Sequence, residues 1–240
     1  MKVKSIEFLN YKNINKYIHS FGRESAYDTP LFKILFWRRL KYFIKVILKL
    51  QNLCKTEFRK VLDIGFNLGH FSLNYGTINP KAELYGLDIK YKEKYERRFI
   101  IQLFKKFSIN FNIVIQDIQE KSFFQDEFFD LIVAFDVLEH VKSPKLALDE
   151  IKRILKNDGI LLISVPIESK LLRFFKIFYK KTVKQDLNLE NHWQGEIPSF
   201  KEFDKLVKKE FRLIYNQYYP FKNFPSIFSY DILYILSKNQ

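Results

Sequence analysis

Glycines and carboxylates follow two short apolar runs of the chain at a spacing that suits binding of a nucleoside. Residues 63–69 read Asp-Ile-Gly-Phe-Asn-Leu-Gly, so that Gly65, Asn67 and Gly69 occupy alternate positions directly after the first run. Glycines at such a turn let a ligand approach the backbone, and Asn is among the few other residues that tolerate positive φ. Asp88 ends the second run about 20 residues later, where a carboxylate can accept hydrogen bonds from both ribose hydroxyls.

A second set of chemically capable side chains follows a third apolar run, residues 129–134. If a helix begins directly after that run, Asp136, Glu139 and His140 share one face, because positions i, i+3 and i+4 are neighbours. His192 comes from a later segment, and we expect it to converge with Glu139 and His140 on the same pocket. Two interpretations stay open: a site for Mg, Mn or Zn made by these four side chains, or a metal-free pocket with an imidazole as general base.

The elements that must position these residues alternate between strand and helix from residue 58 onward. Strands are predicted at 59–64, 83–88, 111–115, 129–134, 159–165, 211–217 and 232–236, and helices at 69–77, 91–107, 143–156 and 199–209. Alternation of this kind predicts parallel pairing with right-handed crossovers. The expected fold is therefore α/β: a doubly wound, mostly parallel seven-stranded sheet with an N-terminal helical extension.

Residues 1–57 are predicted to form that extension, and residues 58–240 the main domain. The extension holds 12 Lys and Arg against 4 Asp and Glu, and Lys41, Lys45 and Lys49 recur every four residues within an apolar helix at 31–50. This helix, with the basic-aromatic stretch 171–181, could lie on an anionic membrane surface. The alternative, which we favour, is that both segments pack on the sheet.

Composition sets limits on partners and compartment. The net charge of +14 is compatible with an anionic partner, but charge alone specifies no site, and no RNA-binding module is recognisable. The single cysteine, Cys54, excludes an internal disulfide. The N-terminus lacks the apolar core of a signal peptide, and no run reaches the ~18 apolar residues of a membrane span. We therefore expect a cytoplasmic protein, with peripheral contact to the inner membrane face as an option.

Four ordered motifs resemble those of class I S-adenosylmethionine-dependent methyltransferases. Residues 63–69 resemble motif I, commonly Asp-x-Gly-x-Gly-x-Gly, with Asn67 in place of one glycine. Residues 116–118, 129–141 and 155–166 continue the resemblance in the same order, and the group most similar is that of the ubiquinone and menaquinone pathway enzymes. The resemblance implies S-adenosylmethionine as the cofactor. It assigns the cofactor contacts to Asp63, Gly65, Asn67, Gly69, Asp88, Ile89, Asp117, Ile118 and Phe135.

The resemblance also implies the reaction, without naming the acceptor. We expect O-methylation of a small-molecule, lipid or glycan acceptor, with His140, His192 and Glu139 as catalytic residues and a substrate-covering insertion at about 167–199. One alternative is a metal-assisted RNA 2′-O-methyltransferase, because residues 136–140 resemble the Glu-x-x-Glu-His motif of small-RNA 3′-end methyltransferases, with Asp136 replacing the first Glu. Another is a membrane- or partner-binding protein that keeps the fold without turnover.

Overall fold

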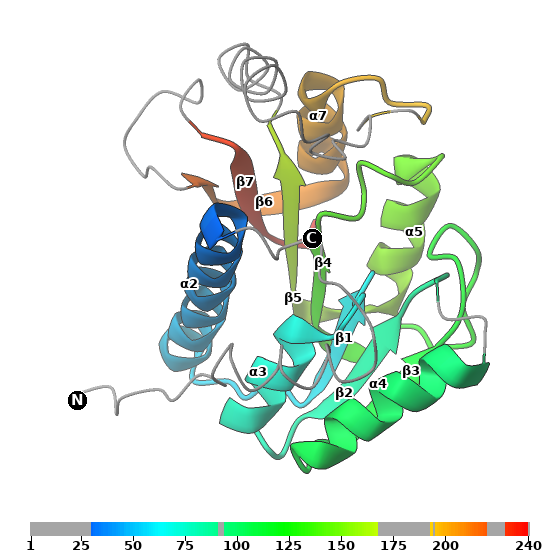
Figure 1. Cartoon of the computed structure of the whole chain (residues 1–240). Helices are drawn as coiled ribbons and strands as arrows, with labels where there is room; N and C mark the ends of the chain where they lie inside the picture. Colours follow the sequence, from blue (N-terminus) through cyan, green and yellow to red (C-terminus); the bar gives the residue numbers. More distant parts are fainter. Residues whose placement is uncertain (1–29, 91–93, 168–192, 194, 220–228, 240) are drawn as a thin grey trace, which may run out of the picture. The chain divides into compact units, whose positions relative to one another are not determined.

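The structure is a computed structural model that describes residues 30–90, 94–167, 193, 195–219 and 229–239 (Figure 1). The chain divides into two compact units, Met1–Gln116 and Asp117–Gln240, which we describe separately. The predicted boundary near residue 57 remains a prediction. None of the helices in the described part of the chain combines the length and the apolar character needed to cross a bilayer.

The first unit is a three-stranded parallel sheet with helices. In chain order it contains α2 (Pro30–Cys54), β1 (Lys60–Ile64), α3 (His70–Ile78), β2 (Glu83–Leu87), α4 (Lys94–Lys106) and β3 (Phe111–Val114). The strand order is β3-β2-β1, and the register pairs Asp63 with Gly86 and Gly86 with Ile113. Alternation of strand and helix brings the carboxyl ends of β1 and β2 to one edge of the sheet, as the sequence predicted.

Aromatic packing fixes α4 against this sheet. The rings of Phe104 on α4 and Phe111 on β3 stack with centroids 4.0 Å apart, and Phe66 meets Phe111 edge to face at 5.2 Å. A side chain at Gly86 would collide with Phe111 and Phe66, so the middle of β2 must be bare for both rings to fit. Figure 1 shows α4 running along β3.

Helix α2 buries its apolar face and exposes its basic face. The buried side chains are Trp37, Leu40, Phe43, Ile44 and Ile47, and the exposed row is Ile34, Arg38, Lys41, Lys45 and Lys49. This spacing is that of an amphipathic helix with one face in a protein core. The predicted helix is confirmed over Pro30–Cys54, and the buried face favours packing within the protein over insertion into a bilayer.

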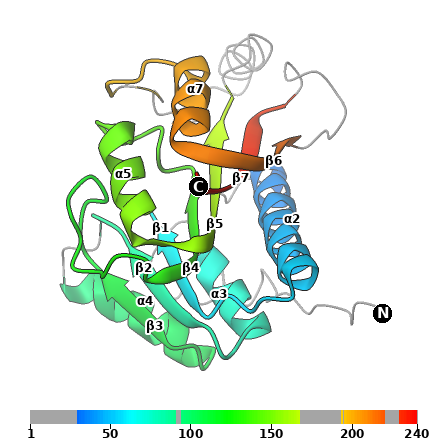
Figure 2. The same cartoon turned by 180° about the vertical axis from the view of Figure 1, so that it is seen from behind.

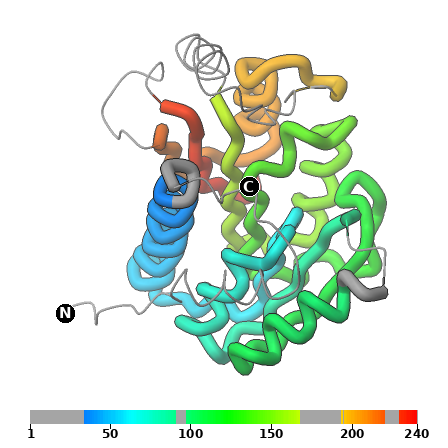
Figure 3. Tube along the Cα trace, viewed as in Figure 1, coloured from blue at the N-terminus to red at the C-terminus, as the bar shows by residue number. Residues whose placement is uncertain are grey.

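The second unit contains the other four strands of the seven-stranded sheet. Its elements are β4 (Phe129–Phe135), α5 (Pro144–Ile154), β5 (Leu155–Pro166), α7 (Phe200–Glu210), β6 (Phe211–Tyr219) and β7 (Asp231–Lys238). Their order is β4-β5-β7-β6, with β4 and β5 parallel and β7 antiparallel to both of its neighbours. The tube in Figure 3 traces this terminal hairpin in orange and red beside β5. The predicted α/β class, a mostly parallel seven-stranded sheet, is confirmed.

Helices α5 and α7 lie side by side, as the rear view shows (Figure 2). Glu210 at the end of α7 pairs with Lys145 and Lys152 of α5 at 3.6 and 3.7 Å. Ser199 caps α7 by accepting from the Glu202 N–H, and Pro144 opens α5 at a position where its missing N–H costs nothing.

The predicted helix 143–156 is wrong at its end. The helix stops at Ile154, and β5 already begins at Leu155, which is paired with Phe129 of β4. The register then shifts, because Ile160 is the next β5 residue paired with β4, opposite Leu131. The turn-forming residues 157–159 therefore lie within an irregular strand instead of between a helix and a strand.

Candidate functional site

The turn after β1 is held by three positive-φ residues at alternate positions. Gly65, Asn67 and Gly69 have φ values of 66°, 47° and 68°. Gly69 is doubly constrained, because a Cβ there would also lie 2.6 Å from the ring of Phe104. The Gly69 N–H donates to the Phe66 carbonyl at 2.7 Å, which closes the turn directly before α3. Asn67 is thus accommodated in the left-handed region, as its residue type allows.

Asp88 is tied to this turn by its carboxylate. Oδ2 accepts from the Asn67 N–H at 3.0 Å and Oδ1 accepts from the Lys90 N–H at 2.9 Å. Each carboxylate oxygen has a further lone pair, so Asp88 can still accept from two hydroxyls of a ligand. Ile89 beside it is 57% exposed, so its side chain is accessible to a ligand.

Asp63 has a different environment from Asp88. It is buried, and its Oδ2 accepts from the Ser72 hydroxyl at 2.6 Å, which joins the end of β1 to α3. Burial raises the pKa of Asp63 to about 7, opposed by the Ser72 hydrogen bond and assisted by the negative charge of Asp88. The pKa of Asp63 is therefore raised into the neutral range at the end of β1, directly before the glycine turn.

His70 is a residue of this site that the sequence interpretation missed. It is the first residue of α3, it is buried, and burial lowers its pKa to about 4. Its ring meets Phe36 and Trp37 of α2 edge to face, at centroid distances of 5.3 and 5.5 Å. The neutral imidazole thus anchors α2 against the helix that follows the glycine turn. The adjacency of His70 to Gly69 was the available signal.

In the second unit, Asp117 begins a loop that leads to β4. Its Oδ1 accepts from the Gln119 backbone N–H at 2.9 Å, and Gln119 Nε2 lies 3.0 and 2.9 Å from the two carboxylate oxygens. Gln119 Oε1 in turn accepts from the Ser143 N–H at 2.7 Å. Ile118 between them is buried.

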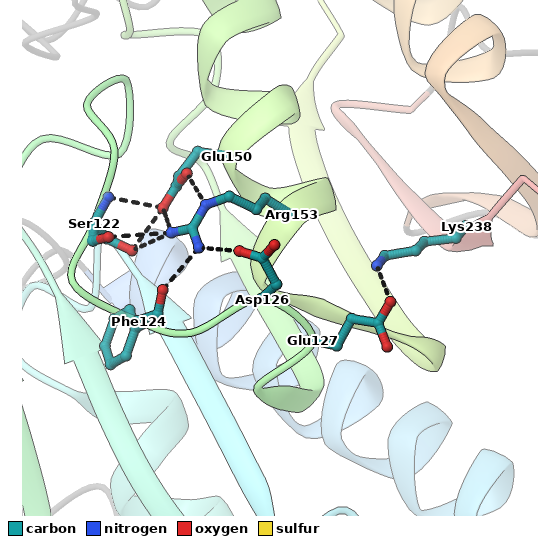
Figure 4. A network of polar contacts seen from close by, with 7 residues as sticks. All are labelled: Ser122, Phe124, Asp126, Glu127, Glu150, Arg153 and Lys238. Atoms are coloured by element: carbon teal, nitrogen blue, oxygen red, sulfur yellow. Dashed lines mark hydrogen bonds and ion pairs between the residues drawn. The ribbon is translucent and has the colours of Figure 1, made fainter.

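The far end of the same loop is clamped by Arg153 of α5 (Figure 4). Its guanidinium donates to Glu150 at 2.8 and 2.6 Å, to the Phe124 carbonyl at 2.8 Å and to Asp126 at 2.6 Å. Burial alone would raise the pKa of Glu150, but hydrogen bonds from Arg153 and Ser122 outweigh it and hold that pKa below its usual value. The loop that carries Asp117 is therefore fastened at one end to Ser143, the N-cap residue of α5, and at the other to Arg153 of α5.

The segment after β4 is a turn, and the helix predicted over 136–140 is wrong. Asp136 has φ 56°, which a right-handed helix excludes, and α5 begins only at Pro144. Long-range hydrogen bonds hold this conformation: the Asp136 N–H donates to the Ser164 carbonyl at 3.0 Å, and the Ser164 hydroxyl donates to Asp136 Oδ1 at 3.1 Å. Phe135, the last residue of β4, is partly exposed.

Glu139 and His140 are nevertheless neighbours in this turn. The Glu139 side chain is fully buried, the His140 side chain is 36% exposed, and Nε2 of His140 lies 3.8 Å from Oε1 of Glu139. The Trp193 N–H donates to the Glu139 carbonyl at 3.0 Å, so the residue after His192 contacts this turn. His192 itself, and most of the predicted insertion, lie outside the described residues. Among the residues that are described, no three His, Cys, Asp or Glu side chains are grouped to hold a metal ion.

The first unit has a cavity of about 190 Å³ that is separate from the glycine turn. Arg59 at the start of β1, Ala82 just before β2 and Gln51 of α2 contribute to its lining. It therefore opens at the amino ends of the strands, opposite the glycine turn, and contains none of the predicted site residues.

Comparison with known proteins identifies a family. The profile described as a methyltransferase domain matches residues 36–206. An uncharacterized protein of Methanocaldococcus jannaschii is 33% identical over 147 residues, which cover 59% of this chain and 57% of that protein. The chain thus spans little more than half the length of that relative.

Solved structures share the fold. An S-adenosylmethionine-dependent methyltransferase of Clostridium acetobutylicum superimposes with a TM-score of 0.63 at 15% identity, over 94% of this chain and 99% of that one. Magnesium protoporphyrin IX methyltransferase of Synechocystis, solved with S-adenosylhomocysteine bound, gives 0.62 at 14% identity over 96% of each chain.

Proposed function

The chain belongs to the methyltransferase domain family, and on that premise we propose that it transfers the methyl group of S-adenosylmethionine to a hydroxyl of a small-molecule, lipid or glycan acceptor. The observation that carries the cofactor assignment is the glycine turn. Gly65 and Gly69 leave its backbone without side chains at these two positions. The Asp88 carboxylate accepts from the Asn67 N–H and keeps lone pairs that can accept from a ligand. The turn thus offers close backbone approach, and Asp88 offers acceptors for the ribose hydroxyls of a nucleoside.

Each unit by itself carries residues to which we assign cofactor contacts. In the first, Gly65, Asn67 and Gly69 give close backbone approach and Asp88 accepts from the ribose hydroxyls, while Ile89 covers the adenine. In the second, Asp117 accepts from the adenine amino group, and Ile118 and Phe135 contribute apolar surface. Asp63, whose buried carboxylate accepts from Ser72, supports the turn and remains a proposed cofactor contact at the end of β1.

The chemistry would be an in-line displacement at the methyl carbon. The acceptor oxygen forms a bond to that carbon while the carbon–sulfur bond breaks, leaving S-adenosylhomocysteine. S-adenosylmethionine supplies a methyl group that is already activated by the sulfonium charge, so the protein mainly aligns the acceptor and excludes water. His140 would take the hydroxyl proton, with Glu139 behind its ring to orient it and compensate the charge acquired. His192 remains a proposed partner in this step.

A peripheral contact with an anionic membrane surface is compatible with α2. Its apolar face is used in the protein, so the exposed row Arg38, Lys41, Lys45 and Lys49 would bind by charge alone. Such a contact would bring the enzyme to a lipid acceptor without inserting it.

Two measurements test the proposal. Calorimetry with S-adenosylhomocysteine tests the cofactor site, and absence of binding would favour the non-catalytic alternative. Methyl-tritiated S-adenosylmethionine, incubated with separate RNA, lipid and small-molecule fractions of a cell extract, tests the acceptor class. Label in RNA that depends on added divalent metal would favour the RNA 2′-O-methyltransferase instead.

The role of His140 is tested with a matched pair of variants. His140→Ala should lower turnover far more than affinity for S-adenosylhomocysteine, because the loss falls on the transition state. Lys142→Ala, at an exposed position in the same turn, should change neither. Equal loss of turnover and affinity in His140→Ala would mean that His140 supports the cofactor pocket.

A further inference from the structure

The side-chain amide of Gln119 uses both of its ends. Nε2 donates toward the two oxygens of Asp117, at 3.0 and 2.9 Å, and Oε1 accepts from the Ser143 backbone N–H at 2.7 Å. The orientation of the amide is fixed by chemistry, since a flipped amide would set oxygen against a carboxylate and NH₂ against an N–H. Gln119 is therefore a two-sided connector between the loop after β3 and the first residue before α5.

The connection continues beyond Ser143. Its hydroxyl donates to Glu196 Oε2 at 2.6 Å, and the Glu196 N–H donates to the Lys142 carbonyl at 2.8 Å. Between these contacts, a Cβ at Gly195 would lie 2.4 Å from the Lys142 carbonyl oxygen and 2.5 Å from that of Val141, so this segment runs directly against the turn. The same turn carries Glu139 and His140. One chain of hydrogen bonds thus leads from Asp117 to the proposed acceptor side.

The geometry points to a role that the family motifs do not assign. We propose that Gln119 is a positioning residue for the cofactor's base: it fixes the Asp117 carboxylate in the orientation that accepts from an exocyclic amino group, and ties that orientation to the turn at 139–143. This inference rests on the proposed function, in which Asp117 faces the adenine. Among the described residues, the other hydrogen bond to the Asp117 carboxylate comes from the Gln119 backbone N–H, while Arg153 clamps the loop at its other end.

Base discrimination is the property that such positioning controls. Adenine presents an amino group at position 6, whereas hypoxanthine presents an oxygen there and a donor at the neighbouring N1. A fixed carboxylate accepts from the adenine amino group and is repelled by the hypoxanthine oxygen. A carboxylate that can turn reaches the N1 donor of hypoxanthine instead. Loss of Gln119 should therefore reduce the preference for adenine more than it reduces binding as such.

The experiment compares S-adenosylhomocysteine with S-inosylhomocysteine, its hypoxanthine analogue, by calorimetry on the full chain. Gln119→Leu keeps the side chain at a similar volume and removes both hydrogen-bonding ends. It should lower the ratio of the dissociation constant of S-inosylhomocysteine to that of S-adenosylhomocysteine by about tenfold, the scale of one hydrogen bond to a charged group. Gln119→Glu keeps the shape, places a second carboxylate beside Asp117, and should lower the ratio as well. Gln125→Leu, exposed in the same loop, is the control and should leave the ratio unchanged.

A double-mutant cycle separates positioning from general weakening. In an Asp117→Asn background, Gln119→Leu should change the ratio by less than twofold, because the group it positions has lost its charge. An unchanged ratio in both Gln119 variants, with wild-type binding of S-adenosylhomocysteine intact, overturns this inference and leaves the proposed function standing. Failure of the wild type to bind S-adenosylhomocysteine overturns both. If Gln119→Leu does not fold, Gln119→Glu decides the question alone.

Discussion

Replacement of Asp88 tests the cofactor site most directly, because its carboxylate has two separable tasks. It accepts from the Asn67 and Lys90 N–H groups within the protein, and it is proposed to accept from two ribose hydroxyls of the cofactor. Asp88→Ala removes all four interactions. Asp88→Asn keeps the shape and one oxygen as acceptor, but it loses the charge and sets an NH₂ against one of the two backbone N–H groups. Unfolding reports the internal role of Asp88 and ligand binding reports its external role.

The expected magnitude follows from these contacts. Both internal hydrogen bonds are at exposed positions, where water can replace the carboxylate, so the free energy of unfolding should fall by only about 1 kcal/mol. The two ribose contacts are hydrogen bonds to a charged group, and their loss should weaken binding of S-adenosylhomocysteine by about 1.5–3 kcal/mol, or roughly 10- to 150-fold in the dissociation constant. Asp88→Asn should fall between the wild type and Asp88→Ala.

The assay is titration calorimetry with S-adenosylhomocysteine, combined with urea unfolding to verify that each variant is folded. Glu83→Ala is the matched control, since Glu83 is an exposed carboxylate at the opposite end of the same strand β2. It should leave the dissociation constant unchanged. A folded Asp88→Ala protein with wild-type affinity would refute the assignment of Asp88 and, with it, the placement of the ribose at this edge.

Four further outcomes are expected from other parts of the structure. Burial lowers the pKa of His70 to about 4. As pH falls from 6.5 to about 4, the free energy of unfolding of the wild type should therefore drop by about 3 kcal/mol relative to that of His70→Phe. Urea unfolding of both proteins at each pH measures this difference. Asp63, with its pKa raised to about 7, should act in the opposite sense: its contribution to the free energy of unfolding should be lost as pH rises from 3.8 to about 7. Urea unfolding of His70→Phe should reveal this trend, because the titration of His70 is absent from that variant. Gly195→Ala should reduce methyl transfer more than binding of S-adenosylhomocysteine, because the added Cβ displaces the segment from the turn that carries His140; wild-type turnover would contradict this contact. Arg153→Ala should lower the free energy of unfolding by about 3–5 kcal/mol, because it leaves Glu150 buried without its cation, and a loss below 1 kcal/mol in urea unfolding would show that the clamp is not needed.

Local sequence was sufficient where the backbone itself dictates the structure. The alternation of strands and helices followed from short apolar runs and their punctuation, and the chain order then fixed parallel pairing. Positive φ at Gly65, Asn67 and Gly69 follows from residue types that tolerate it, and the place of Asp88 follows from the end of its strand. These features depend on few residues close together, which is why sequence predicted them.

Only tertiary structure decided the features that depend on distant partners. The turn at 136–140 exists because Asp136 pairs with Ser164, 28 residues later, and periodicity cannot reveal such a competitor of the helix. The early start of β5 depends on pairing of Leu155 with Phe129, and the neutral state of His70 depends on burial beside α2. Gln119 carried no signal in the sequence, because an amide becomes a connector only when a carboxylate and an N–H lie on its two sides. Spacing along the chain therefore determined which groups were available for chemistry, whereas long-range hydrogen bonds and burial determined their orientation and charge.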